Sequence, residues 1–247
     1  MDGSMGVPII DIHSHILPYL DDGARNMAEA IAMAADAYDG GTRVMVVTPH
    51  ANQKGRFENY ATSQMQDIFE KFQWELVRNQ IPLVVLPGME IYASKDMVSY
   101  IRRKRLTPLA GSKVFLVEFS FRTTIKEIEY LLEEMLYAGF QPMIAHPERY
   151  TWRGDIIEEV MALKEQGCYI QVNGDSVLGD LGEEARYNAN KLLEADLVDV
   201  ISSDCHSLRF RRGNLEQVQE HLIQEYGNQR AEMLLYNKAK ELLQIKI

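Results

Sequence analysis

The sequence predicts an α/β fold in which seven strands alternate with helices and build a barrel of seven repeats with a mainly parallel sheet. Short apolar runs alternate with longer amphipathic segments along the chain, without a linker rich in Pro, Gly or Ser. Histidines and carboxylates recur where the apolar runs stop, and the loops after the strands of a barrel gather at one end. An open doubly wound sheet also collects sites there, but no Gly-x-Gly-x-x-Gly follows the first run. The pattern leaves open whether the sheet closes.

The first strand is expected to run into two histidines. Side chains alternate along a strand, so His13 and His15 would point the same way, close enough to share a metal. The next segment, 26–38, reads as an alanine-rich helix that Gly40 and Gly41 end. The later segments follow by the same periodicity: strands at 43–48, 83–86, 113–119, 141–145, 169–172 and 198–202, and helices at 57–80, 95–105, 125–138, 155–166, 182–195, 215–225 and 229–243.

Composition bounds the class of protein. The 247 residues are 46% hydrophobic and 25% charged, which fits one globular domain over 1–247, with 1–7 expected to be a flexible start. A net charge of -10 argues against a nucleic-acid partner. Two cysteines give no disulfide framework, which favours a reducing compartment. No apolar run approaches the ~20 residues that span a bilayer, and no signal peptide is evident, so we expect a cytoplasmic protein.

The polar residues at the predicted strand ends suggest a metal centre. A single histidine in such a place is usually hydrogen-bonded in a core or lies at the surface, but the repeated placement favours metal binding. The set exceeds what one ion can use, which predicts two or three ions, and nitrogen and carboxylate ligands without cysteine suit manganese, iron or zinc. Glu90 is the best candidate to bridge two ions. The candidate ligands are His13, His15, Asp22, His50, Glu90, His146, Asp204 and His206.

Two arginines add a means of binding phosphate. Neighbouring ions lower the pKa of a shared water to ~7 and hold both oxygens of an in-line displacement, which is the chemistry of phosphoester hydrolysis. Arg149 lies three residues beyond His146, and Arg211 lies five beyond His206. A guanidinium is a planar, bidentate phosphate ligand. Either arginine alone fits a surface or salt-bridge role equally well, but their places beside ligands favour phosphate binding.

Six motifs connect these residues with a known family. The chain resembles the PHP (polymerase and histidinol phosphatase) superfamily, and from residue 9 to the C-terminus it is similar to the manganese-dependent protein-tyrosine phosphatases of bacterial capsule and exopolysaccharide operons. The motifs are Asp11-Ile12-His13-Ser14-His15, Asp21-Asp22-Gly23, Thr48-Pro49-His50, Gly88-Met89-Glu90-Ile91-Tyr92, Ala145-His146-Pro147-Glu148-Arg149-Tyr150 and Ser203-Asp204-Cys205-His206.

The resemblance implies a distorted (β/α)7 barrel with a trinuclear centre. One ion would lie on His13, His15, Glu90 and Asp204, and Glu90 would bridge to a second ion. His50 and His146 would hold that second ion, while Asp22 and His206 would hold the third. Arg149 and Arg211 would bind phosphate, although Arg209 and Arg212 compete with Arg211 for this role. The implied substrate is the tyrosine-phosphorylated C-terminal tail of a membrane-linked tyrosine kinase that governs polysaccharide chain length and export.

The mechanism expected from these residues is attack of a metal-bridging hydroxide on phosphotyrosine, with Arg149 and Arg211 stabilising the equatorial oxygens. His206 or Asp22 would serve as the acid if metal does not fully engage them.

Other functions fit the same residues. A phosphatase for histidinol phosphate or another small phosphomonoester would share every ligand, and a non-catalytic scaffold of an export complex is a further alternative. The Cys-x5-Arg spacing of Cys205 and Arg211 matches cysteine-dependent phosphatases, but the insert contains no glycine, so we interpret it as coincidence. The basic run 101–105 is interpreted as a solvated helix face.

Overall fold

The computed structural model describes residues 6–245, and these form nine strands that pair only in parallel. They are arranged in two sheets, of order β1-β2-β4 and β3-β5-β6-β7-β8-β9. Residues 1–5 of the segment expected to be flexible lie outside the described residues. The strands are β1 (Ile9–Asp11), β2 (Thr42–Val47), β3 (His50–Ala51), β4 (Val84–Pro87), β5 (Glu90–Tyr92), β6 (Val114–Glu118), β7 (Gln141–Ala145), β8 (Tyr169–Asn173) and β9 (Val200–Ser202).

The nine strands occupy seven positions around the sheet, because β3 continues the course of β2 and β5 continues that of β4 beyond the predicted strands 43–48 and 83–86. Residues 48–49 separate β2 from β3, and residues 88–89 separate β4 from β5. Proline has no N–H for a strand ladder, which accounts for the break at Pro49. At Gly88 the chain approaches its neighbour closely, since a Cβ there would meet Val46 Cγ1 at 2.8 Å. The second and third positions therefore pass from one sheet to the other.

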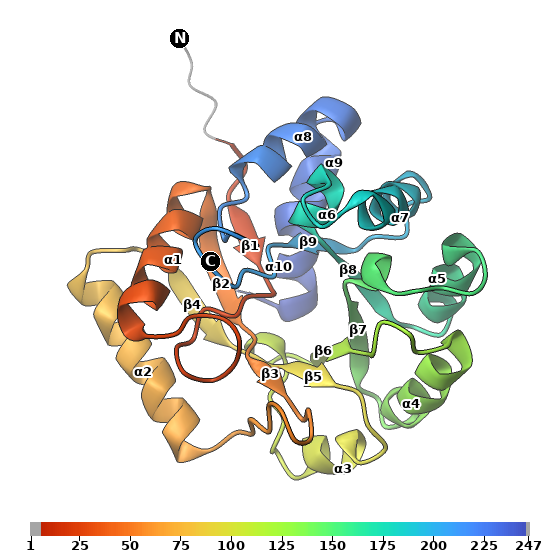
Figure 1. Cartoon of the computed structure of the whole chain (residues 1–247), viewed down its shortest axis with the longest axis horizontal. Coiled ribbons are helices and arrows are strands. Elements are labelled where there is room, and N and C mark those ends of the chain that lie inside the picture. The colour runs from red at the N-terminus through yellow and green to blue at the C-terminus, as the bar shows by residue number, and fades with distance from the viewer. Residues whose placement is uncertain (1–5, 246–247) are drawn as a thin grey trace.

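The last position pairs with the first and closes the barrel. Beyond β1 and β9, the His15 N–H donates to the Cys205 carbonyl at 2.9 Å, and the Asp204 N–H donates to the His13 carbonyl at 2.9 Å. Ser14 and Cys205 form a parallel bridge between these segments. The prediction of a distorted seven-repeat α/β barrel is confirmed, and Figure 1 shows the helices arranged around the strands.

The helices lie close to their predicted bounds where strong end signals occur. Thr124 begins one with a reciprocal capping box to Glu127. Thr62 caps another, so the predicted helix at 57–80 starts only at Ser63. The helices are α1 (Met27–Asp39), α2 (Ser63–Arg78), α3 (Met97–Arg102), α4 (Ile125–Tyr137), α5 (Ile156–Glu165), α6 (Gly174–Leu178), α7 (Glu183–Glu194), α8 (Glu216–Tyr226), α9 (Asn228–Glu232) and α10 (Lys238–Leu243), with 3-10 turns η1 (Leu109–Gly111) and η2 (Pro147–Arg149) and a π-helical segment η3 (Met233–Asn237).

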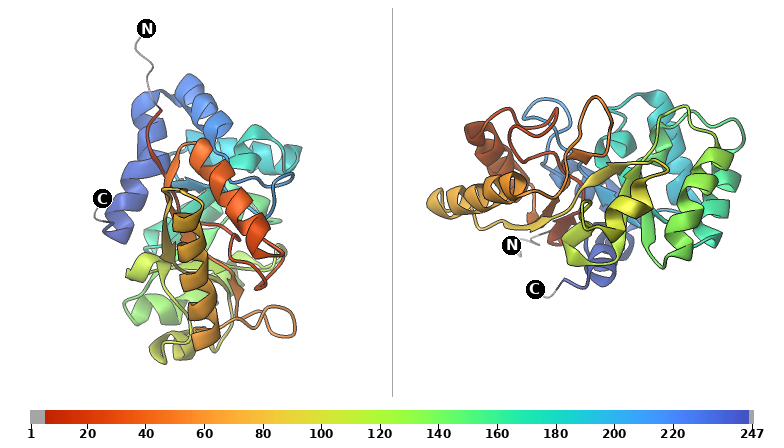
Figure 2. Two further views of the ribbon diagram at one scale, coloured as in Figure 1. Left: turned by 90° about the vertical axis from the view of Figure 1, so that its left-hand side faces the viewer. Right: turned by 90° about the horizontal axis from the view of Figure 1, so that it is seen from below.

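Alternate strand residues pack on opposite sides of the barrel wall. Val44 and Val46 belong to the interior cluster, whereas Met45 and Val47 pack against α1 and α2. The interior cluster also receives α10 and η1, and Figure 2 shows the C-terminal helix beneath the strands. Polar side chains occupy the other end, where the strands stop. Within residues 6–245, no helix combines the length and apolar character needed to cross a membrane.

Candidate metal centre

All eight predicted ligands converge at the carboxyl ends of the strands. They come from the segments after β1, β2, β4, β7 and β9 and form overlapping groups whose ligand atoms lie within 4.8 Å of one another. Six of the eight are buried, while His50 is partly exposed and Asp22 is exposed. The groups are His15, Asp22, His50 and His206; His13, Glu90 and His146; His13, His15 and Asp204; and His50, Glu90 and Glu118.

Three of the imidazoles are oriented by hydrogen bonds at Nδ1. His13 Nδ1 lies 3.0 Å from Gln171 Oε1, His15 Nδ1 lies 2.7 Å from Asp21 Oδ2, and His206 Nδ1 lies 2.8 Å from the carbonyl oxygen of Asp204. Each partner atom is an acceptor, so each Nδ1 donates and each Nε2 keeps its lone pair. Such outer partners fix the ring of a metal-binding histidine.

The arrangement of the resulting lone pairs fits a cation. His13 Nε2 and His15 Nε2 lie 3.2 Å apart, and each is 3.3 Å from Asp204 Oδ1. Although burial opposes it, the neighbouring carboxylates, chiefly Asp204 for His13 and Asp21 for His15, raise the pKa of both imidazoles. These basic atoms therefore need positive charge among them, supplied by protons or by metal ions. Asp204 Oδ1, Glu90 Oε2 and His206 Nε2 are buried without a hydrogen-bond partner among the described residues. The donor set therefore fits metal ions.

Glu90 lies in the middle of the cluster, with its two oxygens facing different imidazoles. Oε1 is 2.9 Å from His146 Nε2 and 3.3 Å from His13 Nε2. Oε2 is 2.8 Å from His50 Nδ1 and 3.2 Å from His15 Nε2. Burial lowers the pKa of His146 to about 4, so this ring is neutral at pH 7 and retains a lone pair. This is the position that a bridging carboxylate requires.

Glu118 is a ligand candidate that the sequence analysis missed. It ends β6, where its Oε2 lies 3.5 Å from His50 Nδ1 and its Oε1 lies 4.0 Å from His146 Nε2. Burial and the negative charge of Glu90 raise the pKa of Glu118 to about 8. Like the other candidates, Glu118 is a polar residue at the end of an apolar run, here 114–117. It was missed because the predicted strand extended to residue 119 and so placed Glu118 inside the strand.

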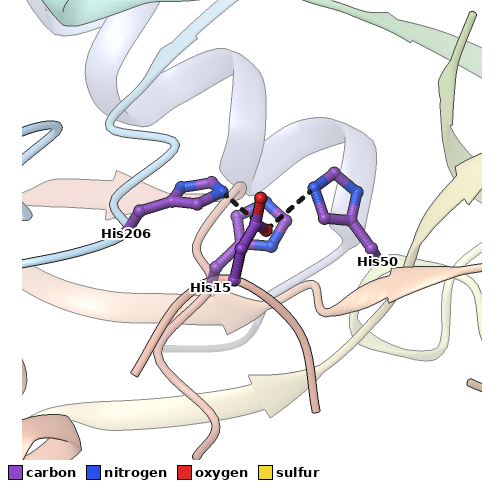
Figure 3. Close-up of side chains that lie close together, drawn as sticks. His15, His50 and His206 are labelled. Atoms are coloured by element: carbon purple, nitrogen blue, oxygen red, sulfur yellow. Dashed lines mark ion pairs between the residues drawn. The ribbon is translucent and has the colours of Figure 1, made fainter. Parts of the chain in front are cut away.

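His50 lies with Asp22 and His206 on the open side of the cluster. Asp22 Oδ1 is 3.5 Å from His50 Nε2 and 3.4 Å from His206 Nε2. Figure 3 shows His15, His50 and His206 converging here, with dashed lines from the last two to a carboxylate. Through Nδ1, His50 also faces Glu90. His146 Nε2 faces the same two carboxylates, Glu90 and Glu118, so the pairing of His50 with His146 that the resemblance implies stays a prediction.

The two predicted arginines meet at one carboxylate oxygen. Arg149 Nη1 lies 3.3 Å from Asp204 Oδ2, and Arg211 Nη2 pairs with the same oxygen. The Asp204 carboxylate thus presents one oxygen to histidines and the other to guanidinium groups. Among the competing arginines, Arg212 pairs with Asp36, and Arg209 is exposed with no ion pair among the described residues. Arg211 is therefore the one that faces the cluster.

The residues around Arg149 explain its motif. His146 has a left-handed backbone (φ 36), which turns the chain from β7 into η2. Glu148 is buried and accepts hydrogen bonds from Asn173 N–H at 3.1 Å and Ser176 Oγ at 2.7 Å. The Tyr150 hydroxyl accepts from Phe119 N–H at 3.1 Å. The His-Pro-Glu-Arg-Tyr segment is thus anchored to the neighbouring strands on both sides while it holds a ligand and an arginine at the mouth.

Cys205 is not placed to act as a nucleophile. Its side chain is fully buried at the junction that closes the barrel, and burial raises the pKa of its thiol to about 12. A reactive cysteine needs a thiolate and access to substrate. The interpretation of the Cys-x5-Arg spacing as coincidence agrees with this environment.

A hollow of about 170 Å³ opens above the cluster. Phe121 is the one apolar side chain in its lining, and its ring stands at 90° to the His146 ring with centroids 5.9 Å apart. The Arg149 guanidinium lies 4.9 Å from the centre of the same ring. The hollow thus combines an aromatic edge with cations. Its lining consists of Asp22, His50, Gln53, Arg56, Glu118, Phe121, His146, Arg149 and Arg211.

Comparisons with known proteins agree on one family. A family model described as capsular polysaccharide synthesis, CpsB/CapC, matches residues 9–244. The tyrosine-protein phosphatase CpsB of Streptococcus agalactiae is 31% identical over 245 residues, covering 95% of this chain and 98% of its own. A crystal structure from work on YwqE of Bacillus subtilis and CpsB of Streptococcus pneumoniae, described there as metal-dependent tyrosine phosphatases, has a TM-score of 0.86 at 31% identity and covers 97% of this chain and 96% of that one.

A more distant likeness concerns the fold alone. The phosphotriesterase homology protein of Escherichia coli has a TM-score of 0.59 at 12% identity and covers 96% of this chain and 98% of its own.

Proposed function

Because the chain belongs to the CpsB/CapC family of capsular polysaccharide synthesis proteins, we propose that it is a metal-dependent protein-tyrosine phosphatase. The observation that carries this proposal is the convergence of buried, lone-pair-bearing imidazoles and carboxylates beneath two arginines. Without cations that cluster is electrostatically unfavourable. Phosphoester hydrolysis uses both parts: ions at the cluster and guanidinium groups beside it.

The ions we propose are two or three Mn²⁺, with iron or zinc as alternatives. The predicted ligands, together with Glu118, would hold them, and Glu90 would bridge. Bound ions would supply a water of lowered pKa and neutralise phosphate charge. The Nδ1 hydrogen bonds of His13, His15 and His206 keep the Nε2 atoms directed at the cluster before any ion binds.

Arg149 and Arg211 are proposed to bind the phosphoryl oxygens. Both guanidinium groups reach Asp204 Oδ2 and both line the hollow, so both have donors close to where a phosphate would sit. Arginine donors held in advance at this place stabilise the charge that develops on equatorial oxygens. Arg149 is also held by its contact with Phe121, which orders the side chain before substrate binds.

The structure favours metal binding over proton donation for His206 and Asp22. The Nδ1 proton of His206 is directed at a backbone carbonyl, and burial lowers the pKa of this imidazole, which leaves Nε2 without a proton at neutral pH. The contact with His206 lowers the pKa of Asp22, so its carboxyl group is ionised. Neither group therefore directs a proton into the hollow. A tyrosine leaving group has a pKa near ~10, so the phenolate can leave with little help from an acid.

The size and lining of the hollow favour a phosphorylated protein over a small ester such as histidinol phosphate. A small-molecule pocket usually measures ~300–1,000 Å³ and encloses its ligand, whereas this hollow measures about 170 Å³. It has room for a phosphate and part of a ring but not for a whole enclosed ligand. Phe121 offers an apolar face to an aromatic ring at its edge.

The family supports a proposal for the cellular role. We propose that the substrate is the tyrosine-phosphorylated C-terminal tail of a bacterial tyrosine kinase that regulates capsule or exopolysaccharide synthesis, and that the protein acts in the cytoplasm. The family description supports the link to capsular polysaccharide. Cys168 and Cys205 are both unpaired and buried, which suits a reducing compartment.

A choice between substrates tests the proposal. Chelator-stripped protein is supplied with Mn²⁺, Zn²⁺ or Mg²⁺ and assayed on a phosphotyrosyl peptide and on histidinol phosphate. We expect Mn²⁺ to restore hydrolysis of the peptide with little turnover of histidinol phosphate. A preference for histidinol phosphate would be consistent with the proposed metal centre but would contradict the proposal that the substrate is a protein.

A further inference from the structure

A second and larger hollow adjoins the catalytic one. It measures about 620 Å³ and lies between α6, the turn after it, and the segment from β9 to α8; Figure 1 shows α6 beside α8. Arg211 lines both hollows. We infer that this groove, lined by Leu178, Leu181, Arg209, Phe210 and Arg211 among others, binds the polypeptide next to the phosphotyrosine, an inference that rests on the proposed phosphatase function.

The loop that forms one wall is held in a fixed shape. The Ser207 hydroxyl donates to the Phe210 carbonyl at 2.8 Å and accepts from the Phe210 N–H at 3.0 Å. The His206 N–H donates to the Arg211 carbonyl at 2.8 Å, which closes the loop at its base. Gly213 anchors the far end, because a Cβ there would lie 3.1 Å from Ala37 Cβ. The loop is therefore organised before a ligand binds, which lowers the entropic cost of binding.

This fixed loop presents an aromatic ring and a cation to solvent. Phe210 is 80% exposed and Leu208 is 40% exposed. Arg209 is also exposed, and the described residues offer it no ion-pair partner. Exposed aromatic and arginine side chains are the residue types that contribute most to protein binding. The half-buried Leu178 and Leu181 add aliphatic surface to the same groove, whose lining also includes the carboxylates of Asp175, Asp180 and Glu216.

The two hollows differ in size, and this difference indicates what occupies the larger one. The catalytic hollow, at about 170 Å³, accepts only the phosphorylated side chain, so the chain that delivers this side chain must lie outside it. The groove is more than three times as large and begins at the arginine that would bind the phosphate. An apolar side chain within a few residues of the phosphotyrosine would pack on Phe210, Leu178 and Leu181. The chemistry of the groove therefore selects a phosphotyrosyl segment with a neighbouring apolar residue.

Substrates of different length test the inference. Manganese-loaded wild-type protein and Phe210→Ala are assayed on p-nitrophenyl phosphate and on two phosphotyrosyl nonapeptides that carry either leucine or glycine on both sides of the phosphotyrosine. We expect Phe210→Ala to lower kcat/KM for the leucine peptide about fivefold to tenfold, as for an aromatic anchor. Its kcat/KM for p-nitrophenyl phosphate should stay within about twofold of wild type, since that substrate does not reach the groove.

Tyr137→Ala is the matched control. Tyr137 ends α4 before β7 begins, at the opposite end of the barrel from the metal centre, and it is 93% exposed. This variant should have the same kcat/KM as wild type for all three substrates.

Three results would contradict the proposal that the groove binds the substrate polypeptide. In the first, wild-type protein treats the leucine and glycine peptides alike. In the second, Phe210→Ala lowers peptide and p-nitrophenyl phosphate turnover equally. In the third, Phe210→Ala changes the elution volume of the protein without changing peptide turnover, which would assign the groove to contacts between copies of the chain. A wild-type protein that hydrolyses neither peptides nor p-nitrophenyl phosphate overturns the proposed function as well.

Discussion

Replacing Glu118 with glutamine should stabilise the metal-free protein while weakening the metal-loaded enzyme. Burial and the charge of Glu90 raise the pKa of Glu118 from 4.5 to about 8. Each pKa unit corresponds to ~1.4 kcal/mol, so an ionised Glu118 costs the metal-free fold up to about 5 kcal/mol. Its side chain is 14% exposed, and solvent screening reduces the expected gain to about 2–4 kcal/mol.

Because the pKa of Glu118 is raised in the folded state, the gain in the free energy of unfolding from Glu118→Gln should depend on pH. A carboxylate with a raised pKa in the folded state contributes no penalty below pH 4.5, and its penalty grows as pH rises from there to about 8. Urea unfolding of chelator-stripped wild type and Glu118→Gln should therefore give similar free energies near pH 5 and a gap that widens toward pH 9. Glu133→Gln, an exposed carboxylate on α4, is the matched control and should show no gap.

The same variant should bind metal less well, because an amide is a weaker ligand than a carboxylate. With Mn²⁺ added, Glu118→Gln should need more metal for half-maximal activity, about tenfold to a hundredfold. The reasoning is refuted if stripped Glu118→Gln is no more stable than wild type at pH 9, or if the stability gap does not change with pH.

Four further substitutions test separate parts of the site. Glu90→Gln should abolish Mn²⁺-dependent phosphotyrosine hydrolysis with an unchanged circular dichroism spectrum, and full activity would exclude its bridging role. Arg149→Ala should lower kcat/KM by ~10²–10³, as for loss of one donor to the transition state; a purely structural role would instead appear as a lower Tm at equal turnover. Phe121→Ala should raise the inhibition constant of phenylphosphonate severalfold but not that of inorganic phosphate, and equal effects on both would remove its role toward the ring. Cys205→Ser should retain turnover in the presence of Mn²⁺, whereas an inactive but folded variant would support a mechanism in which the Cys205 thiolate attacks the phosphate.

Most of the centre was predictable because parallel strands bring their carboxyl ends together. That rule located His50, Glu90 and His146 without knowledge of which strands pair. Side-chain alternation along the first strand predicted that His13 and His15 lie together, and their Nε2 atoms lie 3.2 Å apart. The places of Arg149 and Arg211 shortly after His146 and His206 predicted the two arginines.

What the sequence did not reveal depends on contacts between distant segments. Asp21, which orients His15 and accepts from the His50 N–H at 2.9 Å, differs from its neighbour Asp22 only in where the loop turns it. The grouping of His50 with Asp22 arises from the loop after β1. The division of two strands at Pro49 and Gly88 follows from the close approach of neighbouring chains. The short helix α6, which lines the groove beside Phe210, has only five residues, too few for a periodic signal.

The most direct measurement titrates Mn²⁺ into chelator-stripped protein and follows bound metal and phosphotyrosyl-peptide hydrolysis in the same samples. We expect two or three ions per chain and activity that rises only as they bind, with Glu90→Gln binding fewer ions and remaining inactive. Full hydrolysis by protein that holds no metal, or metal binding that leaves the protein inactive toward phosphotyrosine, would contradict the account.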